Sequence, residues 1–205
     1  MAGNRIVIVG AGPAGVRCAE TLVDAGVRPL VIDEAGRSGG QIYRRQPANF
    51  TRASATLYGT EAVRAAAVHQ TFDTLIDHID YLPDTLVWNI AGRRVYALSG
   101  TTRRTFDFDA LVICAGATDR MMPVKGWTLP GAFSLGAAQI ALKSQACAIG
   151  NDVVFLGSGP LLYLVANQYR KAGARVAAVL DTSSLRARAA ALPKLLAAAG
   201  ILTIG

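Results

Sequence analysis

Cysteine and histidine are scarce in this chain of 205 residues. The three cysteines, Cys18, Cys114 and Cys147, lie far apart and form no Cys-x-x-Cys pair, which excludes a disulfide framework and the usual zinc and iron–sulfur spacings. The two histidines, His69 and His78, are nine positions apart, so on one helix they face opposite sides and cannot share a metal ion. The sequence therefore predicts no metal site and two solvated histidines. Unpaired thiols suit a reducing compartment and indicate a cytoplasmic protein.

Charged residues are also few, at 17% of the chain against 52% hydrophobic residues. This balance excludes intrinsic disorder, which needs the opposite composition. The net charge is +7, but the basic residues are scattered as pairs and form no run, so we expect no binding to nucleic acid. One such pair, Arg44-Arg45, could neutralise a phosphate, meet a partner or form an exposed basic loop. The longest uncharged stretch, residues 153–169, contains glycine and proline and predicts a strand, a turn and a helix start, with no membrane span.

The chain does contain a clear strand–helix–strand pattern at its start. Residues 5–9 form a β-branched apolar run, the following helical pattern stops at Gly26, and a second buried strand covers residues 28–33. The remaining pattern predicts an α/β fold in three layers, in which a parallel sheet is joined by helices and a small antiparallel β-meander. The elements expected after the second strand are a loop at 36–50, a helix at 61–81, a meander at 85–108, a strand at 110–115 and a helix at 136–146.

The turn between the first strand and the first helix has the sequence GAGPAG, which matches GxGxxG. Gly10 permits the tight turn, Gly12 lets the backbone approach a pyrophosphate, and Gly15 lets the helix pack on the strand. The start of the helix offers free N–H groups to phosphates, and Glu34 ends the second strand, where it can accept hydrogen bonds from a ribose. The full context favours a dinucleotide site over a simple glycine turn. The predicted cofactor-binding residues are Gly10, Gly12, Pro13, Ala14, Gly15 and Glu34.

A second copy of this pattern begins near residue 152. A strand at 153–156, a helix at about 161–171 and a strand at 175–180 follow one another, and Asp181 lies 24 positions after Gly157, the spacing that also separates Glu34 from Gly10. The repeat predicts a second dinucleotide-type module. Its predicted site residues are Gly157, Gly159, Pro160 and Asp181.

The second module departs from the first at one position. Leu162 replaces the third glycine, so the helix must lie further from the strand or the site is altered. The negative charge of Asp181 would repel a 2′-phosphate, which favours NAD or another plain adenine nucleotide over NADP. A module that has lost its ligand is the alternative.

Several short motifs resemble one superfamily of flavoproteins with two dinucleotide-binding domains. They are GAGPAG at 10–15, VIDE at 31–34, Gly39-Gly40-Gln41, and LVICAGA at 111–117 with Pro123 and Gly126 after it. In that superfamily the first module binds FAD and the second, inserted in the first, binds NAD(P)H. The resemblance implies that Gly40, Gln41, Ala115 and Gly116 line the path towards the flavin.

Longer motifs resemble one subfamily. They are GGQIYRRQP at 39–47, TLYG at 56–59, GWTLPGAFSLGAAQ at 126–139 and GSGPLLYLVANQY at 157–169. This subfamily comprises the nucleotide-binding subunits of heteromeric opine oxidases, hydrogen cyanide synthase, and proline or hydroxyproline dehydrogenases, and GSGPLL is its usual form. The resemblance implies an FAD-binding subunit, with NAD or ATP/ADP at the second site. A second flavoprotein subunit would oxidise a small amino or imino acid.

The resemblance also implies a domain organisation. Residues 1–146 correspond to the FAD-binding domain without its usual C-terminal return segment, and residues 151–205 correspond to the start of the inserted NAD or adenine-nucleotide domain, with a third strand at 201–204. The superfamily normally continues further, so we expect a portion of a larger subunit or a truncated product. The cysteine-rich segment of many subfamily members is absent from these residues.

No general base or nucleophile stands out in the sequence. Hydride chemistry would then reside in the flavin, with the protein binding and orienting it. Two alternatives stay open at this point: a stand-alone NADH-dependent flavoprotein reductase, and a non-catalytic adenine-nucleotide-binding module that supports assembly.

Overall fold

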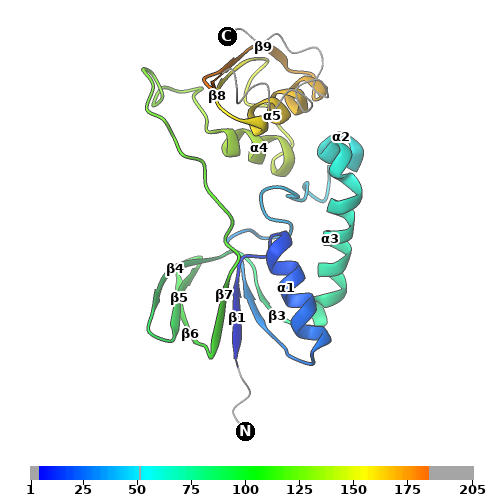
Figure 1. Ribbon diagram of the computed structural model, residues 1–205, viewed down its shortest axis with the longest axis vertical. Coiled ribbons are helices and arrows are strands. Elements are labelled where there is room, and N and C mark those ends of the chain that lie inside the picture. Colours follow the sequence, from blue (N-terminus) through cyan, green and yellow to red (C-terminus); the bar gives the residue numbers. More distant parts are fainter. Residues whose placement is uncertain (1–4, 51, 185–205) are drawn as a thin grey trace. The chain divides into compact units, whose positions relative to one another are not determined.

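A computed structural model describes residues 5–50 and 52–184 of the chain (Figure 1). Contacts between residues divide it into two compact units: the first takes residues 1–45 and 58–117, and the second takes residues 46–57 and 118–205. The compact units divide at residue 117, ahead of the domain boundary expected after residue 146. The reason is that α4 (Leu135–Ser144) shares a hydrophobic core with α5 (Pro160–Lys171).

The first unit is built on a parallel sheet of four strands. In spatial order these are β3 (Asp80–Leu82), β2 (Leu30–Ile32), β1 (Ile6–Val9) and β7 (Ala110–Ile113). The side chains of β2 are buried on both faces, as expected of a strand inside a parallel sheet. Two helices that contact each other, α1 (Pro13–Asp24) and α3 (Ala62–Leu75), lie along one side (Figure 1).

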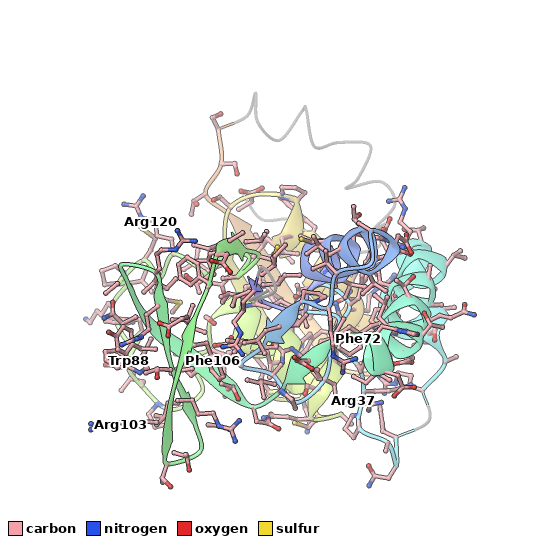
Figure 2. The ribbon with its side chains drawn as sticks, turned by 90° about the horizontal axis from the view of Figure 1, so that it is seen from below. Arg37, Phe72, Trp88, Arg103, Phe106 and Arg120 are labelled. Carbon is pink, nitrogen blue, oxygen red and sulfur yellow. The ribbon has the colours of Figure 1, made fainter. Side chains whose placement is uncertain are left out.

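An antiparallel meander forms the third layer of this unit. It consists of β4 (Thr85–Ala91), β5 (Arg94–Ser99) and β6 (Thr102–Asp107). Val95 and Phe106 of the meander join Val7 and Ile32 of the parallel sheet in one hydrophobic core, whereas Trp88 points away from this core and is 59% exposed (Figure 2). The predicted three-layer α/β fold is therefore confirmed.

One predicted helix ends earlier than expected. The helix expected over residues 61–81 becomes α3, a short 3-10 turn η2 (Ile76–His78) and then strand β3. The strand forms because the N–H of Asp80 donates to the carbonyl of Pro29, which places β3 beside β2. Two further short elements were not predicted: α2 (Ser54–Tyr58) and the 3-10 turn η1 (Gly59–Glu61).

The second unit places α4 and α5 against a pair of parallel strands, β8 (Asp152–Gly157) and β9 (Arg175–Asp181). Its core contains Phe155 of β8 and Tyr169 of α5, whose rings meet edge to face at 5.5 Å. The strand expected at residues 201–204 lies outside the described residues. Within the described parts of the chain, none of the helices is long and apolar enough to cross a lipid bilayer.

Candidate nucleotide-binding sites

The glycine turn of the first unit lies at the carboxyl end of β1, between β2 and β7. Gly10 has a φ of +104° and its N–H donates to the carbonyl of Ile32 at 2.7 Å. A Cβ atom at Gly10 would overlap the carbonyl oxygen of Cys114, and a Cβ atom at Gly15 would overlap the carbonyl oxygen of Gly10. Both positions therefore need glycine because backbone segments meet there without room for a side chain.

A second pair of glycines faces this turn. A Cβ atom at Gly40, where φ is +60°, would lie 2.9 Å from the Cα of Gly12. The N–H of Gly39 donates to the carbonyl of Ala11 at 2.9 Å, which fixes this approach. The structure thus brings together two predicted site residues, Gly12 and Gly40, from separate loops. The two backbones touch and together form a surface without side chains, beside the start of α1, whose first N–H groups no side chain caps in the described structure.

Two acids, Asp33 and Glu34, stand together at the end of β2 and differ in exposure. Glu34 is exposed, whereas Asp33 is buried. The carboxylate of Asp33 accepts a hydrogen bond from the N–H of Ala11 in the glycine turn and another, at 2.7 Å, from the N–H of Ala35. Asp33 therefore fixes the turn and is a site residue that the sequence reasoning missed.

Strand register shows that Asp33 is the counterpart of Asp181. Val9 pairs with Ile32 in the first unit, and Leu156 pairs with Leu180 in the second. Each acid stands one position later, and each accepts the N–H two residues ahead of it at 2.7 Å. The sequence count matched Asp181 with Glu34 because β9 contains one extra residue, at the register shift opposite Val153 and Val154.

The remaining predicted residues of the first site are found near the end of β7. Ala115 lies beside the glycine turn, since its backbone nitrogen would be 3.2 Å from a Cβ atom at Gly10. Gly116 has a φ of +72° and is exposed, as are Gln41 and Ala14, while Pro13 is the first residue of α1. Burial raises the pKa of the thiols of Cys18 and Cys114, which keeps them protonated and poorly nucleophilic.

Two residues of the first unit, His69 and Arg45, are more buried than predicted. His69, expected to be solvated, is half-buried on α3, and its Nε2 lies 2.7 Å from the carbonyl oxygen of Tyr43. Arg45, considered as an exposed basic residue, keeps only 14% of its side chain exposed because it pairs with Asp73 of α3. Neither contact joins residues close in the sequence, so no local pattern predicted them.

The burial of His69 predicts a dependence of stability on pH. Burial lowers the pKa of His69 below its ordinary 6.5, and Arg45 and Arg37 act in the same direction, while the hydrogen bond to Tyr43 and the charge of Asp73 oppose the change. As pH falls below 6.5, the unfolded chain takes up this proton before the folded chain, so stability present above that pH is lost.

We expect the free energy of unfolding to fall more steeply below pH 6.5 in the wild type than in His69→Gln, which cannot titrate. A Trp127→Phe background leaves Trp88 as the fluorescent reporter of the first unit. Curves of equal slope for the two proteins would contradict the assignment.

The glycine turn of the second unit has more room than the first. A Cβ atom at Gly157 would lie 3.7 Å from Cδ1 of Leu162, an ordinary contact. Leu162 is buried in the core of this unit, so the helix here accommodates a side chain at the position where the first unit has room only for Gly15. The helix starts at Pro160 after Gly159, whose φ is +90°.

A cavity of about 830 Å³ opens at this turn. Gly157, Ser158 and Thr182 line it at the carboxyl ends of β8 and β9, and Arg120 and Trp127 line it from the segment before α4. Its size and its mixture of apolar and polar groups are typical of a small-molecule site.

A hydrogen bond within the second unit holds the side chain of Asp181. Its carboxylate accepts a hydrogen bond of 2.7 Å from the hydroxyl of Tyr163 on α5, and both residues are buried. Tyr169, on the same helix, instead donates to the neutral carbonyl of Ala138 at 2.8 Å. Because a buried hydrogen bond to a charged acceptor contributes more than one to a neutral acceptor, the two hydroxyls should differ in their contribution to stability.

We expect Tyr163→Phe to lower the free energy of unfolding of the second unit by about 2 kcal/mol and Tyr169→Phe by about 1 kcal/mol. Chemical denaturation in a Trp88→Phe background, with Trp127 as the reporter, measures both. An equal or reversed order would show that the Asp181 carboxylate does not depend on Tyr163.

The chain is similar in sequence to a known family and to subunits of known proteins. The family model for pyridine nucleotide-disulphide oxidoreductases matches residues 4–201. The opine oxidase A-subunit of Rhizobium meliloti is 40% identical over 187 residues, which are 87% of this chain and 35% of that protein. Hydrogen cyanide synthase subunit HcnB of Pseudomonas aeruginosa is 36% identical over 178 residues, which are 86% of this chain and 38% of that protein.

Solved structures agree on the fold. L-proline dehydrogenase from P. horikoshii superposes with a TM-score of 0.66 at 19% identity, over 83% of this chain and 34% of that one. The chain spans little more than a third of the two curated relatives. The predicted class, an FAD-dependent oxidoreductase, is confirmed by these matches. The chain belongs to the pyridine nucleotide-disulphide oxidoreductase family.

Proposed function

We propose that the first unit binds FAD across the bare backbone surface between Gly12 and Gly40. The observation that carries this proposal is their approach, at which a Cβ atom on Gly40 would lie 2.9 Å from the Cα of Gly12. Two glycines allow the backbones to touch there, and a pyrophosphate would lie over the surface that they form together. The exposed Glu34 would accept hydrogen bonds from the ribose, and Gln41, Ala115 and Gly116 would continue towards the flavin.

FAD supplies hydride and electron transfer when it is bound. The residues of this chain bind and orient it. The start of α1 directs N–H groups at the phosphates, Asp33 keeps the glycine turn in shape, and the described site contributes no candidate acid or base of its own. Gly10 and Gly15 act indirectly. They let β1, α1 and β7 meet closely enough to form the turn.

The second unit is proposed to take a plain adenine nucleotide, NAD or ATP/ADP, in the cavity lined by Gly157 and Ser158, next to Gly159. By strand register the counterpart of Glu34 in this unit is Thr182, which lines the cavity, whereas the carboxylate of Asp181 is buried and bonded to Tyr163. Pro160 begins α5, so the N–H groups of its first turn would face the phosphates.

The complete protein is proposed to be one subunit of a heteromeric dehydrogenase or oxidase in the cytoplasm. Two of its relatives are subunits by name, the opine oxidase A-subunit and hydrogen cyanide synthase subunit HcnB. By this proposal a second flavoprotein subunit oxidises an amino acid, an opine or a proline-like donor, and this subunit carries electrons away through its flavin.

Reduction of the bound flavin tests the proposal against its alternatives. We expect the visible flavin band to bleach when L-proline or an opine is added anaerobically together with the companion subunit, and not without it. Bleaching by NADH alone, without a companion, would favour a stand-alone reductase. Tight binding of ADP by a chain that takes up no flavin would favour a non-catalytic assembly module.

A further inference from the structure

Helix α3 holds the loop that carries Gly40, although no residue of α3 belongs to the proposed site. His69 provides the first contact: its Nε2 lies 2.7 Å from the carbonyl oxygen of Tyr43. Only an Nε2–H can serve this acceptor, so the neutral ring carries its proton there. The same Nε2 would lie 3.1 Å from a Cβ atom at Gly39, so the ring lies directly behind the glycine pair.

Asp73, one helical turn after His69, provides the second contact. Its two carboxylate oxygens accept from the guanidinium of Arg45 at 2.8 and 3.0 Å. The same guanidinium donates to the backbone carbonyl of His69 at 3.0 Å and to the hydroxyl of Ser38 at 3.1 Å. A planar guanidinium with several fixed partners holds both ends of the loop to the helix.

Aromatic packing and one further hydrogen bond complete the support. The hydroxyl of Tyr43 donates to the carboxylate of Glu61 at 2.8 Å. The ring of Tyr58 meets the ring of Tyr43 at 6.2 Å and that of His69 at 5.9 Å, both edge to face. These contacts restrict the loop to one backbone path, since Tyr43 is held at its carbonyl, its ring and its hydroxyl.

Backbone hydrogen bonds connect Tyr43 to the glycine turn of the proposed site. The N–H of Tyr43 donates to the carbonyl of Gly39 at 3.1 Å, and the N–H of Gly39 donates to the carbonyl of Ala11. We propose that His69 and Asp73 are positioning residues for the FAD pyrophosphate, because they keep Gly40 facing Gly12. This inference rests on the proposed FAD site and adds residues to it that make no contact with the cofactor.

Affinity for FAD, measured with the full chain by quenching of flavin fluorescence, tests the inference. His69→Leu removes the donor and should raise the dissociation constant about tenfold, the loss of roughly one buried hydrogen bond. His69→Gln places an amide N–H near the position of Nε2 and should bind FAD within about threefold of the wild type. Asp73→Asn should also weaken binding, because its amide cannot replace the bidentate ion pair.

Phe72→Leu is the matched control on the same helix. Phe72 is buried and meets Tyr81 edge to face at 4.8 Å, and its side chain has no polar atom with which to hydrogen-bond the loop. This variant should lower the melting temperature of the flavin-free chain while leaving FAD affinity within about threefold of the wild type. If Phe72→Leu weakens FAD binding as much as His69→Leu, or if His69→Gln fails to restore it, His69 acts only through general stability and the inference is overturned.

Amide hydrogen exchange of the flavin-free chain separates this inference from the proposed function. His69→Leu should speed exchange at Gly39 and Tyr43 by about tenfold or more while leaving β1 protected. That result, with a wild type that takes up no FAD, would retain the support of the loop and overturn the FAD site. Unchanged exchange at both residues would overturn the positioning role even if the wild type binds FAD.

Discussion

Gly12→Ala is expected to leave the chain folded and to weaken FAD binding by about 100-fold, equivalent to about 2.7 kcal/mol. The backbone of Gly12 has a φ of −72°, which any residue adopts, and its Cβ atom would lie 3.6 Å from the Cα of Gly40. The methyl group therefore fits the flavin-free fold. It adds bulk to the bare surface that the two backbones form together, over which the pyrophosphate would lie.

A flavin fluorescence titration measures the dissociation constant, and circular dichroism checks the fold. Gly157→Ala is the control from the second unit, where a Cβ atom makes only an ordinary contact with Leu162; it should leave FAD binding unchanged. Normal FAD affinity in Gly12→Ala would place the cofactor elsewhere.

Gly15→Ala is expected to disrupt the first unit itself. Its Cβ atom would overlap the carbonyl oxygen of Gly10, a backbone atom that cannot move without displacing the turn against Cys114. Overpacking of this kind lowers stability by about 3 kcal/mol or more when the backbone must shift, a large share of the stability of a small unit. FAD binding should be lost together with the folded signal.

Denaturation followed by Trp88 fluorescence, again with Trp127→Phe as the background, measures this loss. Arg17→Ala is the control on the same helix, since Arg17 makes an exposed ion pair with Glu20 and an exposed hydrogen bond to Thr71 and should change stability by about 1 kcal/mol or less. A Gly15→Ala protein as stable as the control would mean that α1 does not lie as close to β1 as the structure shows.

The sequence predicted those parts of the fold that local patterns determine. The run at 6–9, the GxGxxG turn and α1 were each predicted within one or two residues, because a buried strand, a glycine turn and an amphipathic helix have their own periodicities. Strand β3 was missed because three residues in extended conformation depend on the edge of β2 for their hydrogen bonds. Nothing within the sequence Asp80–Leu82 distinguishes it from the end of the preceding helix.

The sequence predicted the glycine turn, which one local motif encodes. It did not predict the contacts between segments that are distant in the sequence. Gly10, Gly12 and Gly15 follow from one motif. The equivalence of Asp33 and Asp181 depends on strand register. Counting positions from each glycine turn does not show it, because β9 contains one extra residue. His69 and Arg45 act through contacts with residues 24 to 28 positions away, and a buried histidine on a helix has no sequence signal that separates it from a solvated one.

The most direct test of the central claim is the absorption spectrum of the 205-residue chain after incubation with FAD and gel filtration, compared with Gly12→Ala treated in the same way. The account predicts a visible flavin band at about one FAD per wild-type chain, and little or none in the folded variant. A colourless wild type, or a variant that retains as much flavin as the wild type, would contradict the assignment of Gly12 and Gly40 as the FAD pyrophosphate site.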